Sequence, residues 1–220
     1  MQYLSAILPL FSSILFLGLG ITVYFISKGK LRGVFLRFCY FTFHWQFSWF
    51  VLFSLNSSNY SDLICKIGYS GIIFLPVVFY ETVVHYLDLS KKPLTWFYAA
   101  SIGFLISLWA SDLFIKGAYL QAFGYYPEAG ILHVVYMMMV CILMAIIFFI
   151  LYRVLKEEKN PIKRAQLKFF FISTILFCFS ALDYVLNYPF VVNKLNIQLY
   201  PIGVFFLSFS MLVFVISHFM

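Results

Sequence analysis

The sequence predicts an all-α protein: a polytopic membrane protein built as a seven-helix transmembrane bundle, with its N-terminus outside and its C-terminus in the cytoplasm. Three observations lead to this prediction: the composition, the spacing of the apolar stretches and the placement of the basic residues. Hydrophobic residues make up 64% of the 220 positions and charged residues 10%, whereas a soluble domain carries about 25% charged residues. This small number of charged residues cannot cover a surface that faces water. The composition therefore indicates an integral membrane protein.

Seven stretches of the chain are long and apolar enough to cross a bilayer, which takes about 20 residues of helix. The first three separators, SKGKLRG, NSSNYSD and DLSKKP, are short and polar. The next are longer: IKGAYLQAFGYYPEAG, RVLKEEKNPIKRAQLK and YPFVVNKLNIQL. The chain is therefore predicted to be one domain, residues 1–220, with spans at roughly 4–27, 34–55, 67–87, 94–114, 131–152, 169–187 and 200–219.

The lysines and arginines set the direction of the spans, because cytoplasmic loops are enriched in these residues. Of the 15 basic residues, Lys66, Lys116 and Lys194 lie on one side of the predicted membrane, and the rest lie on the other. This asymmetry predicts an outside N-terminus and a cytoplasmic C-terminus. The residues assigned to the cytoplasmic side are Lys28, Lys30, Arg32, Arg37, Lys91, Lys92, Arg153, Lys156, Lys159, Lys163, Arg164 and Lys168.

Several classes of protein do not fit these features. The net charge of +7 is not clustered on an exposed domain, so it indicates topology and not nucleic-acid binding. The start MQYLSAILPLF has no basic segment of the kind that opens a signal peptide, so the first span is expected to stay in the mature protein. The cysteines show no metal-ligand spacing and are expected to form no structural disulfide; they are Cys39, Cys65, Cys141 and Cys178.

The stretch GYSG, residues 68–71, has the spelling of the nucleophile motif of rhomboid intramembrane proteases. A serine nucleophile needs a histidine base at its own depth and donors for an oxyanion. Of the later histidines, His133 shares the expected depth of Ser70, whereas His85 lies about 22 Å further along the same helix. No paired donors on an earlier span complete such a site. We interpret Gly68, Ser70 and Gly71 as residues that let helices pack closely.

Other seven-helix classes fail on specific residues. A retinal protein needs a lysine on its last span, and residues 200–220 contain none. An animal-type receptor would pair Cys65 with a cysteine in 115–130, which the sequence lacks. A presenilin-type protease needs a GxGD motif, but Asp183 stands in SALDY.

Ionisable side chains inside a bilayer are costly, which makes them candidates for function. Counting from the nearest basic boundary, His44 lies about 10 Å and Glu81 about 8 Å from the inner edge of the membrane. At this common depth we expect a buried His44–Glu81 pair, with His85 one helical turn from Glu81. The pair is either structural, holding two helices together, or a relay that senses protonation or movement.

A second polar group is predicted near the outer side. Asp183 follows Lys168 by fifteen residues, which places it about 8 Å below the outer surface. Aromatic side chains around a few converging polar groups are typical of a ligand pocket, although Asp112 and Glu128 are alternatively hydrated residues at the edge of a loop. The ligand-binding candidates are Asp183, His133, Asp112, Trp109, Tyr126, Tyr184 and Asn187, with Glu128 and Tyr125 close by.

Further motifs lie in the second half of the chain. NPIKRAQLKFFF leads into the sixth span, ALDYV lies within it, and NIQLYPIGVFFLSFSMLVFVIS forms the seventh, which opens Tyr200-Pro201-x-Gly203. With Pro76 in the third span and a longer aromatic outer loop, this pattern resembles the N-terminal seven-transmembrane sensor region of bacterial histidine kinases. Related regions precede GGDEF domains. The chain departs from such kinases by stopping at ISHFM, so it is either part of a longer protein or a stand-alone module.

The resemblance implies a sensor or receptor region of a two-component system, without catalytic activity of its own. Such a region detects a ligand or a membrane state and signals through its last span to a cytoplasmic kinase domain in cis. It also implies a homodimer, located in the bacterial inner (cytoplasmic) membrane.

Pro76, Pro201 and Gly203 are weak points in helices and are candidate hinges. The alternative function is a small polytopic transporter or a stand-alone membrane protein, although the seven spans do not divide into inverted repeats. The expected partners are the lipid bilayer and a small-molecule or lipid-like ligand, with no cofactor, metal or nucleic acid.

Overall fold

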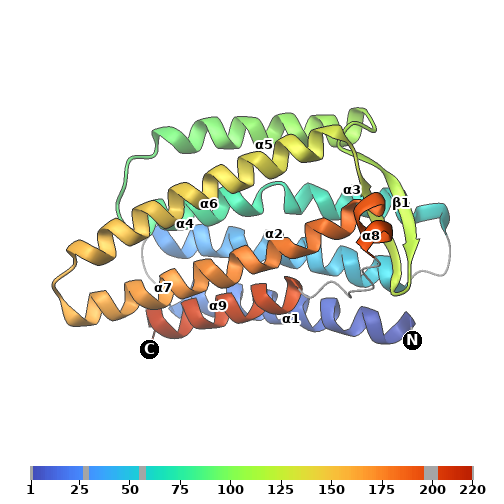
Figure 1. Cartoon of the computed structure of the whole chain (residues 1–220). Helices are drawn as coiled ribbons and strands as arrows, with labels where there is room; N and C mark the ends of the chain where they lie inside the picture. Colours follow the sequence, from blue (N-terminus) through green and yellow to red (C-terminus); the bar gives the residue numbers. More distant parts are fainter. Residues whose placement is uncertain (1, 27–29, 55–57, 196–202, 220) are drawn as a thin grey trace.

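The computed structural model describes residues 2–26, 30–54, 58–195 and 203–219. Its long helices lie side by side along roughly one direction, and a β-hairpin covers one end of them (Figure 1). The elements in chain order are α1 (Gln2–Ile26), α2 (Lys30–Ser54), η1 (Ser58–Tyr60), α3 (Ser61–Ile72), α4 (Leu75–Tyr86), α5 (Lys92–Ala110), β1 (Ile115–Gln121), β2 (Gly124–Ala129), α6 (Ile131–Glu157), α7 (Pro161–Ser180), η2 (Ala181–Asn187), α8 (Pro189–Leu195) and α9 (Gly203–Phe219).

The all-α class is confirmed, and the chain is a multi-pass membrane protein. The helical segments that are long and apolar enough to cross a membrane are Ser5–Ile26, Ser61–Tyr86, Lys92–Ala110, Ile131–Glu157 and Pro161–Asn187. Helix α2 is as long as α1, but its polar side chains, among them Arg37, His44 and Gln46, lower its mean hydropathy. The apolar part of α9 is shorter, and Pro201, one of the predicted hinges, lies outside the described residues.

Helix ends differ from the predicted span limits because charged residues continue a helix beyond the apolar part. Helix α6 extends to Glu157, and α7 already begins at Pro161, eight residues before the predicted start of the sixth span. Asn160 caps α7: its side-chain oxygen accepts hydrogen bonds from the backbone N–H groups of Ile162 (3.0 Å) and Lys163 (3.3 Å). Much of the separator RVLKEEKNPIKRAQLK is therefore helical, with a short turn between its two halves.

The third predicted span is not one continuous helix, because Pro76 divides it into α3 and α4. Proline has no N–H to donate to the carbonyl four residues earlier, and its ring clashes with that carbonyl. At the break, the Phe74 N–H donates to the Gly71 carbonyl three residues earlier (3.2 Å), which forms a tighter turn than that of an α-helix. Pro76 then occupies the first turn of α4, where a missing N–H costs little.

The outer loop after α5 forms an antiparallel hairpin of β1 and β2, which the sequence analysis did not predict. Tyr119 lies opposite Tyr126 in its register. Gly124 turns the chain with a positive φ of 134°, a conformation that favours glycine. The hairpin is fixed to the bundle by Asp62 of α3, whose carboxylate accepts a hydrogen bond from the Ala118 N–H at 2.6 Å.

Helix α9 packs against α7 and α1 through serine pairs. The hydroxyls of Ser173 and Ser210 lie 2.9 Å apart, and each also donates to the other residue's carbonyl, at 2.9 and 2.7 Å. The hydroxyl of Ser12 on α1 lies 2.7 Å from that of Ser208 on α9.

Figure 1 places the C-terminus at the end of the bundle that holds the α6–α7 turn, and the N-terminus and the hairpin at the opposite end.

Candidate functional site: two buried polar groups

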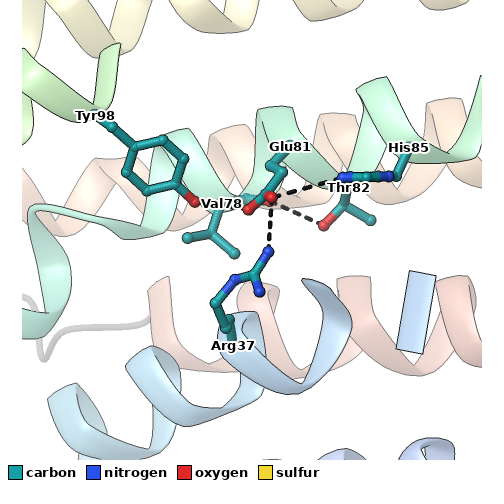
Figure 2. A network of polar contacts seen from close by, with 6 residues as sticks. All are labelled: Arg37, Val78, Glu81, Thr82, His85 and Tyr98. Carbon is teal, nitrogen blue, oxygen red and sulfur yellow. Dashed lines mark hydrogen bonds and ion pairs between the residues drawn. The ribbon is translucent and has the colours of Figure 1, made fainter. Parts of the chain in front are cut away.

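The first polar group inside the bundle joins α2, α4 and α5 (Figure 2). Arg37 Nη2 donates to Glu81 Oε1 at 2.6 Å, and Tyr98 Oη donates to Glu81 Oε2 at 2.7 Å. His85 Nε2 lies 3.7 Å from Glu81 Oε1, one turn along α4. The Glu81 side chain is 11% exposed and that of Arg37 50%. Glu81 is thus a buried acceptor shared by three helices, and its arginine partner reaches it from the surface of the bundle.

The predicted pair of His44 and Glu81 is wrong, because each residue has a different partner. His44 Nε2 bonds to the Ile67 backbone carbonyl of α3 at 2.8 Å. The cause is the start of α2 at Lys30, which puts Arg37 about 10 Å and His44 about 21 Å along the helix. Glu81 lies about 8 Å from the end of α4, level with Arg37, which the sequence analysis treated as a boundary residue.

The second polar group surrounds His133, which is fully buried in the first turn of α6. Its Nδ1 lies 2.8 Å from the Tyr188 hydroxyl, and its Nε2 lies 3.1 Å from the Tyr69 hydroxyl. The Asn187 amide donates to the same Tyr69 hydroxyl and lies 3.4 Å from His133 Nε2. The imidazole therefore links α3 and α6 to the chain around η2.

Tyr136, one turn further along α6, connects this group to the break in the third span. Its hydroxyl donates to the Ile72 carbonyl at 3.0 Å, and this carbonyl is the one that a residue other than proline at position 76 would bind. The same hydroxyl lies 3.3 Å from that of Tyr184 in η2. A side chain of α6 thus satisfies the backbone group that Pro76 leaves free, as polar residues do at proline breaks in membrane helices.

Asp183 connects η2 to the beginning of α9. Its Oδ1 accepts a hydrogen bond from the Gly203 N–H at 2.8 Å, which caps α9 and places a carboxylate at the positive end of its dipole. A Cβ on Gly203 would lie 2.6 Å from Asp183 Oδ2, so glycine permits the close approach. From the hairpin, the Tyr126 hydroxyl donates to the Asp183 backbone carbonyl at 3.2 Å. Burial raises the pKa of Tyr126 well above its ordinary value, so the phenol keeps this proton.

The space beside Tyr126, Asp183 and Tyr184 is a small cavity. Its volume is about 10 Å³, which is enough for one water molecule. The predicted ligand pocket is therefore nearly filled by the protein's own side chains in this conformation. The lining includes Trp45, Trp49, Tyr126, Ser180, Asp183 and Tyr184.

Two of the ligand-binding candidates lie outside this group. The Asp112 side chain is 76% exposed and lies 3.5 Å from Lys66 Nζ, which is the geometry of a surface ion pair. Trp109 is half-exposed and donates from its indole to the Ser70 hydroxyl at 3.1 Å. Glu128 lies 3.4 Å from Lys116 across the hairpin. Asp112 and Glu128 therefore match the alternative of residues at a hydrated loop edge.

The geometry around the GYSG stretch is that of a packing motif. The Ser70 hydroxyl donates to the carbonyl of Lys66 at 2.9 Å, and both ring nitrogens of His133 contact tyrosines. A Cβ on Gly68 would overlap the Trp49 ring, and one on Gly71 would lie 2.8 Å from His44 Cδ2. The packing interpretation of both glycines is confirmed: they let α3 approach α2.

The sequence analysis missed five residues of these groups. Tyrosines are common at the headgroup belt of membrane proteins, so the sequence does not mark the ones that are buried here: Tyr69, Tyr136, Tyr98 and Tyr188. Arg37 was counted as a marker of topology. One available signal was the proline itself, because Pro76 predicts a free carbonyl one turn earlier that needs a donor from another helix.

The family model described as the N-terminal 7TM region of histidine kinase matches residues 8–220. The chain belongs to this family. The match covers almost the whole chain and confirms the resemblance inferred from the motifs around the last two spans. No curated protein and no solved structure matches the chain.

The 7TM region of histidine kinases is a sensor region and is not itself catalytic, so membership of this family makes the chain a membrane sensor module. The two polar groups therefore lie in a region whose family role is sensing in the membrane. Their positions differ: His133 stands in the first turn of α6, directly after β2 of the hairpin, whereas Glu81 stands in α4, which lies toward the opposite end of the bundle (Figure 1).

Proposed function

We propose that the chain detects a ligand or a state of the membrane and passes a conformational signal through α9 to a cytoplasmic histidine kinase domain in cis. The observation that carries this proposal is the hydrogen bond between Asp183 and the first residue of α9, Gly203. It joins the buried polar group near the hairpin to the last helix of the bundle. A helix that leaves the bundle toward a kinase domain is the element that a sensor has to move.

The proposed topology has seven spans, with the N-terminus outside and α9 ending in the cytoplasm of a bacterial cell, across the inner membrane. The charge distribution supports it, because the basic residues gather in the turns expected on the cytoplasmic side. The α6–α7 turn, beside the C-terminus in Figure 1, carries Lys159 and is flanked by further basic residues.

The proposed signal path runs through hydrogen bonds and the backbone of η2. It starts at the carbonyl of Ile72 and passes through the Tyr136 and Tyr184 hydroxyls. From Tyr184 it follows the backbone to the neighbouring Asp183, and then the hydrogen bond to Gly203. Each step joins a different element: the α3–α4 break, α6, η2 and α9. Pro76 and Gly203 are the proposed hinges at the two ends, with Pro201 as a third candidate beside Gly203.

Ligand binding at the His133 group would require the small cavity to open. A ligand shifts a conformational equilibrium only as far as it binds two states unequally. A small cavity lined by aromatic side chains, Ser180 and Asp183 supplies a second state when it opens. The proposed contacts are Asp183, His133, Tyr126, Tyr184 and Asn187. In the other group, Glu81 and His85 form the proposed relay near the cytoplasmic side.

Function as a homodimer is part of the proposal, because a histidine kinase domain joined to α9 would bring two copies of this region together. A change in the position of α9 would then alter how the two kinase domains meet.

The proposal is tested by joining residues 1–220 in frame to the cytoplasmic part of a histidine kinase and measuring autophosphorylation in membrane vesicles. Asp183→Asn should change the basal rate severalfold, because an amide holds the Gly203 N–H more weakly than a carboxylate does. Asp112→Asn is the matched control and should leave the rate unchanged, since Asp112 is exposed. Equal rates for the wild type and Asp183→Asn would refute signalling through this contact.

A further inference from the structure

A second hollow of the molecule lies on its lipid-facing side, between α1 and α2. It is an open groove with a volume of about 480 Å³, within the range of small-molecule sites. Its lining is almost wholly apolar and includes Phe16, Leu17, Gly20, Leu36, Tyr40 and Phe43. Gly20 lets α1 approach α2 closely at the groove, since a Cβ there would lie 2.9 Å from Cys39 Cβ.

One charged residue also lines this groove, and it is Arg37 of the Glu81 group. Its side chain is half-exposed, and its bond to Glu81 uses a single nitrogen, Nη2. A guanidinium has five N–H donors in a planar fork that matches a carboxylate or a phosphate. Arg37, which lines the groove, therefore has donors for a second anion besides Glu81.

The position of Arg37 fits an anion that belongs to a lipid. Arg37 lies about 10 Å along α2 from its first residue, and arginine side chains at this depth extend toward the headgroup region. Arg32, one to two turns closer to that end, is exposed and lies 4.5 Å from the Tyr24 ring of α1. The groove thus offers an apolar track with Arg37 in its lining, and Arg32 stands nearer the start of α2.

We propose that the groove binds an anionic phospholipid of the cytoplasmic leaflet, with one acyl chain between α1 and α2 and its phosphate on Arg37. The phosphate competes with Glu81 for the guanidinium. As Arg37 turns toward the lipid, Glu81 depends more on Tyr98 and His85. Through the group of Figure 2, a lipid bound beside α2 thus changes the contacts that α2 makes with α4 and α5. The role of this lipid as a signal rests on the proposed sensor function, whereas the binding of the lipid does not.

The test measures lipid retention by the purified chain with native mass spectrometry, in mixtures of phosphatidylglycerol and phosphatidylcholine of matched acyl chains. The wild type should retain one phosphatidylglycerol in preference to phosphatidylcholine. Arg37→Gln should weaken this binding about tenfold, the loss expected for hydrogen bonds to a charged group. Arg153→Gln is the matched control, because Arg153 also pairs with a glutamate, Glu157 at 3.4 Å, but on α6.

A second pair of variants tests the groove without touching the ion pair. Leu17→Trp fills it, whereas Ile21→Trp places the same ring on α1 at a position with the same exposure, 48%, that does not line the groove. Retention should fall severalfold in the first and stay unchanged in the second. Glu81→Gln should bind phosphatidylglycerol more tightly, because Arg37 then has no competing carboxylate.

Equal retention of the two lipids by the wild type would overturn the proposal, and so would equal losses in Leu17→Trp and Ile21→Trp. Preferential binding of oleic acid over phosphatidylglycerol would also overturn it, since the site would then select a free carboxylate. These outcomes leave the kinase coupling untouched, because no kinase domain takes part in the measurement. Loss of coupling with lipid binding intact would count against the sensor function alone.

Discussion

Asp183 Oδ1 accepts a hydrogen bond from the Gly203 N–H at 2.8 Å, and both residues are buried. This bond makes a side chain of η2 the N-terminal cap of α9. The approach is so close that a Cβ at position 203 would lie 2.6 Å from the carboxylate. We therefore expect a movement of η2 to displace the first turn of α9. This contact and related ones give four predictions.

The first prediction compares two aspartates. Asp183→Ala should lower the free energy of unfolding by about 2 kcal/mol, because it removes a helix cap and leaves a buried N–H without its acceptor. Asp112→Ala should change it by less than about 0.5 kcal/mol, since an exposed ion pair contributes little. Thermal unfolding of both variants in detergent provides the comparison. Similar small shifts in both would show that Asp183 is not a buried capping residue.

A double-mutant cycle tests the partner of Glu81. Arg37→Ala and Glu81→Ala should be non-additive by about 1–3 kcal/mol, because the two side chains form one ion pair. His44→Ala and Glu81→Ala should add within about 0.5 kcal/mol, because His44 binds α3 instead. Strong coupling of Glu81 to His44 and not to Arg37 would restore the pairing that the sequence suggested.

The carbonyl left free by Pro76 gives a third prediction. Tyr136→Phe should cost about 1–3 kcal/mol, because the buried Ile72 carbonyl loses its donor. Tyr152→Phe, at an exposed position of the same helix, serves as the control and should cost little. In a Pro76→Ala background, the backbone N–H of residue 76 becomes available, so Tyr136→Phe should cost less. An unchanged cost in that background would separate Tyr136 from the helix break.

The fourth prediction concerns two glycines. Gly68→Ala should destabilise the bundle by about 1–3 kcal/mol through overpacking, because its Cβ would overlap the Trp49 ring. Gly18→Ala should be neutral or stabilising by up to about 1 kcal/mol, since nothing lies within 4 Å of a Cβ there and alanine favours a helix. Denaturation midpoints of the two variants measure the difference. Equal midpoints would mean that α2 and α3 do not pack through Gly68.

The helices could be predicted from the sequence because a bilayer demands long apolar segments, and every predicted span contains helix in the described residues. Their ends could not, because capping by Asn160 and charged residues such as Lys156 extend helices past the bilayer edge. The hairpin after α5 was also missed. Its strands are short, and its stability depends on contacts with the bundle, such as Asp62 with Ala118.

The candidate sites were only partly accessible from the sequence. Asp183, His133 and Asn187 were identified from their cost inside a membrane, and the structure brings them to one end of the bundle. The pairing of Glu81 was misjudged because depth was counted from a bilayer edge, whereas the start of α2 sets it. Tyr136 and Tyr98 were overlooked because a tyrosine in a membrane segment looks the same in the sequence at the headgroup belt and in the core.

The central claim is that displacement of α9 relative to its neighbours carries the signal, and a disulfide lock tests it most directly. Cysteines replace Ser173 and Ser210, whose hydroxyls lie 2.9 Å apart on α7 and α9, in the kinase fusion with its native cysteines removed. Autophosphorylation is measured with and without Asp183→Asn, before and after oxidation. The account predicts that Asp183→Asn changes the rate in the reduced protein and that oxidation abolishes the difference. A difference that survives the locked α7–α9 contact would contradict it.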